Sequence, residues 1–135
     1  MPARSIETLR LAALSVRIDD VTLDVSAEAW RSFQPIAGKN TQPLIAQIRV
    51  RATGGPLPPS LATDGIYLVH GGDVFPAFAR EEEERADGAR FAEFTVRDGP
   101  KWPVGDSIDV IVAFKATSAT TYLLRAPKTV ITRVD

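Results

Sequence analysis

The chain has no cysteine and only one histidine, His70, among its 135 residues. Without cysteine it cannot form disulfides, use a thiolate nucleophile, or hold zinc or an iron–sulfur cluster through sulfur. A single histidine also excludes metal sites that need several imidazole ligands. We therefore expect no metal and no other cofactor.

An excess of charge of either sign is also missing. The 16 basic and 17 acidic side chains leave a net charge of −1, whereas a protein that neutralises nucleic-acid phosphates carries a clear surplus of lysine and arginine. No stretch of the sequence interleaves basic with aromatic residues. The composition therefore argues against a nucleic-acid partner.

Long apolar runs do not occur. A membrane-spanning helix needs about 18 or more consecutive apolar residues, and a signal peptide needs about 7–15. The apolar patch Leu11–Leu14 is enclosed by Arg10, Ser15 and Arg17. We expect no membrane span and no signal peptide, and we assign the protein to the cytoplasm by default.

Proline and glycine, in contrast, are plentiful: 10 prolines and 9 glycines are spread along the chain. β-Branched residues are frequent between them. Such a composition favours short strands separated by turns over long helices. The length suits one domain over residues 1–135, because half of the chain would be too small to bury a core of its own.

Two segments show the clearest strand pattern. Leu44–Thr53 places aliphatic residues on one face and polar residues, among them Arg49 and Arg51, on the other. This alternation indicates one buried and one solvent-facing side. Ile108–Ala116 alternates in the same way but carries apolar residues on its second face as well. It is therefore expected to be a central strand, or one that is covered on both sides.

Weaker patterns predict the remaining strands. They are Leu9–Ile18, Val21–Val25, Ile66–His70, Val74–Ala79, Arg90–Arg97, Tyr122–Ala126 and Thr129–Val134. The glycines that precede Asp73 favour a tight hairpin turn. The edges near Leu9–Ile18 and Thr129–Val134 are the candidates for free sheet edges.

Two short segments have helical features. Ser26–Phe33 begins with a serine that is suited to cap a helix. The run Glu81–Glu84 has no apolar stripe, and its like charges repel one another. We expect this run to be a solvated loop or a single polar helical turn.

Eight or nine short strands, with a turn signal after each, are typical of a β-sandwich. We predict an all-β fold: a single immunoglobulin-like antiparallel β-sandwich of about seven to nine strands. A closed barrel around a small ligand is the alternative. The prolines disfavour it, because continuous up-and-down strands tolerate few of them.

The segment Trp102–Phe114 combines a proline and glycine turn with alternating apolar residues. It resembles the entry to the penultimate strand of fibronectin type III and related immunoglobulin-like domains. The resemblance implies the general sandwich architecture. It assigns no functional residue, and Ile108 stands where such domains often place a corner tyrosine.

The segment Ile66–Asp73 contains His70 followed by two glycines, and it is similar to the strand and oxyanion loop of α/β-hydrolase esterases. The sequence has neither a Gly-x-Ser-x-Gly nucleophile elbow nor a second histidine to act as base. A hairpin turn explains the glycines better. A hydrolase with His70 as general base, oriented by Asp73, is the least favoured hypothesis.

Three side chains are candidates for partner recognition. Arg49 and Arg51 share the polar face of one predicted strand, and arginine is enriched at protein interfaces. Trp102 lies in a predicted turn between Lys101 and Pro103. Of the aromatic side chains it is the one most expected to be exposed, and a flat aromatic face suits the apolar face of a sugar ring.

The sequence thus favours a non-catalytic module that binds a partner protein, associates with itself or has a structural role. Strand addition at an exposed sheet edge would be the physical means of association. A small carbohydrate- or ligand-binding domain that uses Trp102 is the alternative. The hydrolase with His70 and Asp73 comes last.

Overall fold

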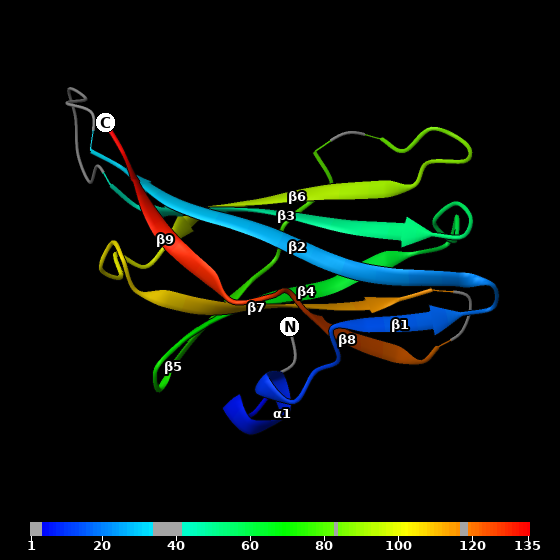
Figure 1. Ribbon diagram of the computed structural model, residues 1–135, viewed down its shortest axis with the longest axis horizontal. Coiled ribbons are helices and arrows are strands. Elements are labelled where there is room, and N and C mark those ends of the chain that lie inside the picture. The colour runs from blue at the N-terminus through cyan, green and yellow to red at the C-terminus, as the bar shows by residue number, and fades with distance from the viewer. Residues whose placement is uncertain (1–3, 34–41, 83, 117–118) are drawn as a thin grey trace.

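Nine strands make up most of the part of the chain that the structure describes (Figure 1). The computed structural model describes residues 4–33, 42–82, 84–116 and 119–135. The strands are β1 (Ser15–Ile18), β2 (Val21–Ser32), β3 (Leu44–Thr53), β4 (Ala62–His70), β5 (Asp73–Ala77), β6 (Phe91–Gly99), β7 (Ser107–Lys115), β8 (Thr121–Arg125) and β9 (Thr129–Val134). One short helix, α1 (Ile6–Arg10), precedes them. The fold is all-β, as the sequence predicts.

The strands form two packed layers, as in a β-sandwich. One layer has the order β5–β4–β7–β8. In the other layer β2, β3 and β6 lie side by side, and β1 pairs with the first residues of β2. β9 joins the layers, because Thr129 and Val130 pair with β7 while Ile131–Val134 pair with β2. The β2–β9 pairing is parallel, and the other named pairings are antiparallel.

The main core lies between the two layers. The aliphatic residues of β3 that are predicted to share a face are all buried there: Leu44, Ala46, Ile48, Val50 and Ala52. Arg49 and Arg51 alternate with them and are exposed. Successive side chains of a strand point to opposite faces, so the pattern in the sequence was sufficient to predict this strand.

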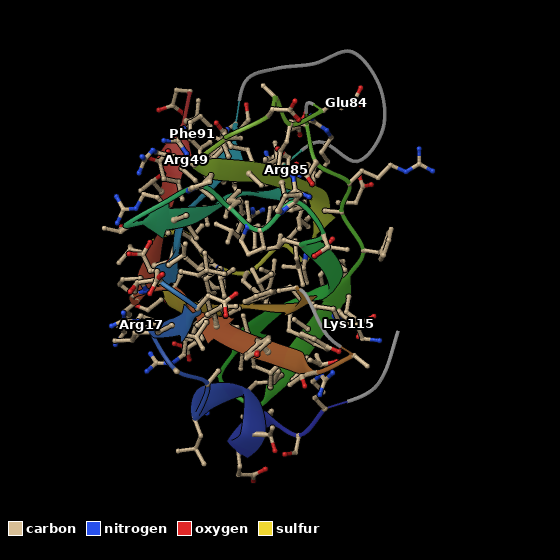
Figure 2. All side chains as sticks on the ribbon, turned by 90° about the vertical axis from the view of Figure 1, so that its right-hand side faces the viewer. Arg17, Arg49, Glu84, Arg85, Phe91 and Lys115 are labelled. Carbon is tan, nitrogen blue, oxygen red and sulfur yellow. The ribbon has the colours of Figure 1, made fainter. Side chains whose placement is uncertain are left out.

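Both faces of β7 are buried, which confirms the prediction of a strand covered on both sides. Its even-numbered apolar residues face the main core, while Ile111 and Ala113 face a second, smaller cluster. Leu9 of α1 is fully buried in this second cluster, together with Tyr67 and Val69 of β4. We call this outer surface of the β5–β4–β7–β8 layer the covered face; Figure 2 shows α1 packed beneath it.

The predicted strand Leu9–Ile18 is wrong in its first half, which contains the end of α1. The hydroxyl of Ser5 caps this helix by accepting a hydrogen bond from the backbone N–H of Thr8 at 3.2 Å. Such a cap, together with the burial of Leu9, favours the helix over an extended chain. In the described ranges no helix is long and apolar enough to cross a membrane.

The helical interpretation of Ser26–Phe33 is also wrong, because most of this segment continues β2. Residues Thr22 to Arg31 pair with β3 without interruption. A serine that suits a helix cap has only a local preference. The ladder of hydrogen bonds to β3 and the burial of Val25 and Ala29 outweigh it.

One of the two predicted sheet edges is wrong, because β9 lies between β2 and β7. The other is confirmed in part: Ala13 bridges to Leu124 of β8, but among the described residues β1 has one named partner strand, β2. The main strand order ends at β5 and β6. β5 contains Pro76, and beside β6 the backbone N–H of Glu82 donates to the carbonyl of Glu93 at 2.9 Å. Proline and short covering segments are features that keep a further strand from adding.

Candidate functional site

The outer surface of the β2–β3–β6 layer differs from the covered face, because in the described part of the chain no helix packs on it. We call it the open face. Its outward side chains alternate with the buried ones along each strand. They include Asp24, Trp30, Ile45, Gln47, Arg49, Arg51, Phe91, Glu93, Thr95 and Arg97.

Arg51 of β3 and Asp24 of β2 form a two-pronged ion pair on the open face. The Nε and Nη2 atoms of Arg51 lie 3.1 and 3.2 Å from the two carboxylate oxygens of Asp24. The register explains the pair, since it places the two residues opposite each other on adjacent strands. The hydrogen bonds to Asp24, and its negative charge, raise the pKa of Arg51. The two hydrogen bonds orient the guanidinium toward β2.

Arg49 is held by two neighbours on β6. Its Nη2 lies 2.8 Å from Oε1 of Glu93, and its guanidinium carbon lies 4.4 Å from the centre of the Phe91 ring. The other carboxylate oxygen of Glu93 accepts a hydrogen bond from Nε2 of Gln47 at 2.8 Å. Phe91 remains 46% exposed. The open face thus presents an aromatic ring beside a guanidinium of fixed orientation (Figure 2).

A trough of about 730 Å³ runs over the open face beside β6. Trp30 of β2, Ile45 of β3 and the outward residues of β6 from Phe91 to Arg97 form its floor. Its wall is the strap, by which we mean residues 78–82 and 84–90 between β5 and β6. Glu84 and Arg85 on the strap line the trough together with Phe91, and Figure 2 labels these residues.

The strap is fixed in place by its own charged residues. Arg85 donates a hydrogen bond to the backbone carbonyl of Leu61, and its Nε lies 3.1 Å from Oε2 of Glu81. Oε1 of Glu82 lies 3.0 Å from Nη2 of Arg97 on β6. These contacts connect the part of the wall at Glu81, Glu82 and Arg85 to β6 and to the backbone before β4.

The glutamate run is only partly the solvated loop that the sequence predicts. Glu81 and Glu82 form ion pairs with arginines, whereas Glu84 is exposed and lines the trough. Glu83 lies outside the described residues. Among the described side chains, no three acidic or histidine groups gather as ligands for a metal ion.

His70 lies at the end of β4, and its carboxylate partner is Asp106 rather than the predicted Asp73. Its Nε2 lies 2.8 Å from Oδ2 of Asp106, and its ring stacks on Trp102 with the centroids 4.9 Å apart. Asp73 faces His70 across the hairpin in the register but is exposed. With one ring nitrogen and one ring face engaged, His70 has the environment of a packed side chain.

Trp102 is half-buried rather than an open platform. Its ring is stacked on His70 and packs against the main core. Its backbone carbonyl accepts a hydrogen bond from Nη1 of Arg31 at 3.1 Å, and Arg31 is itself buried. His70 and Trp102 are separate candidates in the sequence. In the structure they form one cluster, between the end of β4 and the turn that precedes β7.

The trough was missed by the sequence analysis. Trp30 falls in the segment interpreted as helical, and the position of the strap depends on contacts with distant strands. One local signal was present in the sequence. Ile45 is an apolar residue on the otherwise polar face of the strand Leu44–Thr53, but a single apolar residue on a solvent-facing surface is common and does not by itself indicate a site.

No protein-family model, no curated protein and no solved structure matches the chain. The all-β class therefore follows from the structure itself, and the functional argument depends on the open face, the trough and the His70–Trp102 cluster.

Proposed function

We propose that this protein is a non-catalytic interaction module with an immunoglobulin-like sandwich, and that it binds a partner protein through its open face. The observation that carries the proposal is the difference between the two outer surfaces. α1 buries apolar residues of the covered face, whereas the open face displays Arg49, Arg51 and Phe91. In a small sandwich, the face that lacks internal cover is available to a partner.

The chemistry of the open face suits an interface. Arginine and aromatic side chains are enriched where proteins bind one another. Asp24 and Glu93 already hold Arg51 and Arg49 in fixed directions. Because these long side chains are ordered before binding, a partner loses less conformational entropy when it immobilises them.

Binding through the face agrees better with the structure than strand addition at β5 or β6, where the main strand order ends. Pro76 interrupts the donor pattern of β5, and the strap pairs with β6 at Glu93 and Phe94. The outer surface of β2, β3 and β6 is not blocked in this way within the described residues. We therefore propose this surface, rather than the edge at β5 or β6, as the binding site.

The carbohydrate alternative based on Trp102 has less support. His70 stacks on the ring of Trp102, and the ring also packs against the main core. A sugar would have to displace part of this packing to reach a full ring face. The hydrolase hypothesis has the least support. It requires Asp73 to orient His70, but the carboxylate that contacts the imidazole is that of Asp106.

Photo-crosslinking in cells of the source organism tests the proposal. p-Benzoylphenylalanine replaces Ser26, an exposed residue of β2 opposite Arg49 on the open face, and in a matched variant replaces Glu7, an exposed residue of α1. The proposal expects a discrete protein adduct from position 26 and none from position 7. The double substitution Arg49→Ala, Arg51→Ala should remove the adduct at position 26.

An adduct that forms only from position 7 would place the partner on α1 and refute the proposal. An adduct at position 26 that survives the double substitution would also refute the role of the two arginines. A second copy of this chain, captured from position 26 and lost in the double variant, would support the open face as the site of self-association.

A further inference from the structure

We propose that the trough receives an extended segment of the partner protein, about six residues long and without net charge. The inference rests on the proposed function, because it names what the partner places on the open face. Three properties of the trough carry it: the spacing of its floor, the balance of its charges and its apolar end.

The floor has the repeat of an extended polypeptide. Phe91, Glu93, Thr95 and Arg97 are successive outward residues of β6 and all line the trough. Alternate residues of a strand are about 6.6 Å apart, and the distance from Phe91 to Arg97 is about 20 Å. A chain that lies along β6 in an extended conformation presents its own side chains with the same repeat. Each of them can therefore meet an equivalent position of the floor.

The described charges in and beside the trough are of both signs and are mostly paired. Glu81 pairs with Arg85, Glu82 with Arg97, and Glu93 with Arg49, which lies beside the trough and not in its lining. Two further lining residues, Glu84 and Arg90, are exposed and opposite in sign. A strongly acidic or strongly basic segment would repel one member of each pair as much as it attracts the other. Charge complementarity therefore favours an uncharged segment that forms hydrogen bonds to the fixed carboxylates and guanidiniums.

One part of the floor is apolar. Trp30 and Ile45 lie opposite each other on β2 and β3, and both line the trough. Both are partly exposed, so covering them removes apolar surface from water. An aliphatic or aromatic side chain of the bound segment is expected at this position. A contact of this kind stabilises the complex roughly in proportion to the apolar area that it buries.

A selection with a defined probe tests the inference. Phage-displayed random hexapeptides are selected on the full chain, and the enriched peptides are synthesised. The sequence has two tryptophans, so in the Trp102→Phe variant the emission reports on Trp30 alone. Amide chemical shifts of the unmodified chain give a second measurement that does not depend on either tryptophan.

The inference expects enriched peptides without net charge that carry an apolar residue. They should shift the emission of Trp30 and the amide signals of β6. Thr95→Arg, which fills the floor, should weaken binding at least about tenfold, or by about 1.4 kcal/mol. Thr121→Arg is the matched control, since it places the same side chain on β8 of the other layer and should leave affinity unchanged.

Three results would overturn the inference: enrichment of only acidic or only basic peptides, amide shifts that map outside the trough, or no enrichment at all. Linear hexamers of glucose and of N-acetylglucosamine are run in parallel, and binding of one of them in place of every peptide would assign the trough to a sugar. A crosslink from position 26 without peptide binding refutes the trough inference alone. The absence of any crosslink from position 26 in the chain that keeps Arg49 and Arg51 refutes the proposed function.

Discussion

The imidazole of His70 lies nearly flat against the indole of Trp102, with ring centroids 4.9 Å apart and planes inclined by 23°. Asp106 holds the same imidazole from its edge, at 2.8 Å from Nε2. The two rings come from the end of β4 and from the turn before β7. Their contact therefore ties a hairpin to a turn that are distant in sequence.

Removal of the imidazole should uncover Trp102. His70→Ala, in a Trp30→Phe background that leaves Trp102 as the sole tryptophan, is expected to shift its emission to the red and to increase its quenching by acrylamide. The stacked pair contributes about 1 kcal/mol to the free energy of unfolding. Asp73→Ala is the control, because Asp73 is exposed. Equal quenching in both variants would contradict the stacking.

Phe94 and Phe78 provide a matched pair for the main core. Phe94 is 1% exposed and Phe78 is 71% exposed. Phe94→Ala should lower the free energy of unfolding by about 3–5 kcal/mol, because it removes a buried ring and leaves a cavity between the layers. Phe78→Ala should leave it almost unchanged. Urea denaturation of both variants measures the difference, and similar midpoints would show that Phe94 does not support the core.

The docking of α1 depends on a single buried leucine. Leu9 is fully buried in the second cluster, whereas the nearby Leu11 is 84% exposed. Leu9→Ala should lower the free energy of unfolding by about 2–5 kcal/mol. It should also increase the binding of a hydrophobic dye, as the covered face opens. Leu11→Ala should do neither, and dye binding that rises equally in both would argue against α1 as the cover.

Gly99 allows a close approach between the end of β6 and β3. A Cβ atom at this position would lie 2.8 Å from the backbone oxygen of Leu44 and 2.9 Å from its Cβ. Gly99→Ala should therefore destabilise the fold by about 1–3 kcal/mol, since backbone atoms must shift. Gly72→Ala meets nothing within 4 Å and serves as the control. Equal melting temperatures for the two variants would contradict a steric conflict between a Cβ atom at position 99 and Leu44.

Much of the strand content could be predicted because alternation is a local property. Leu44–Thr53 and the two-sided Ile108–Ala116 both have the burial that their patterns predict. The hairpin at Gly71 and Gly72 also forms as expected, with His70 opposite Asp73. In each case the residues within the segment determine which side chains are buried or where the chain turns, and the pairing in the sheet is consistent with that local pattern.

The errors occur where a distant contact outweighs a local preference. Ser26–Phe33 has a suitable helix cap, yet pairing with β3 draws most of it into β2. Thr129–Val134 reads as an edge strand, yet it lies between β2 and β7. In the least favoured hypothesis Asp73 orients His70, whereas the structure places Asp106, from the turn before β7, 2.8 Å from the imidazole. In all three cases the decisive contact comes from a residue distant in sequence.

The sequence by itself determined the class of fold and the polarity of the strand faces, because the spacing of apolar residues dictates which side of each strand is buried. It also placed Arg49 and Arg51 together on a polar face. Only the tertiary structure decided which sheet face α1 covers, how the strap forms a trough over β6, and that His70 meets Trp102. These features depend on the order in which strands pair, which is set by long-range packing and hydrogen bonds that no local pattern encodes.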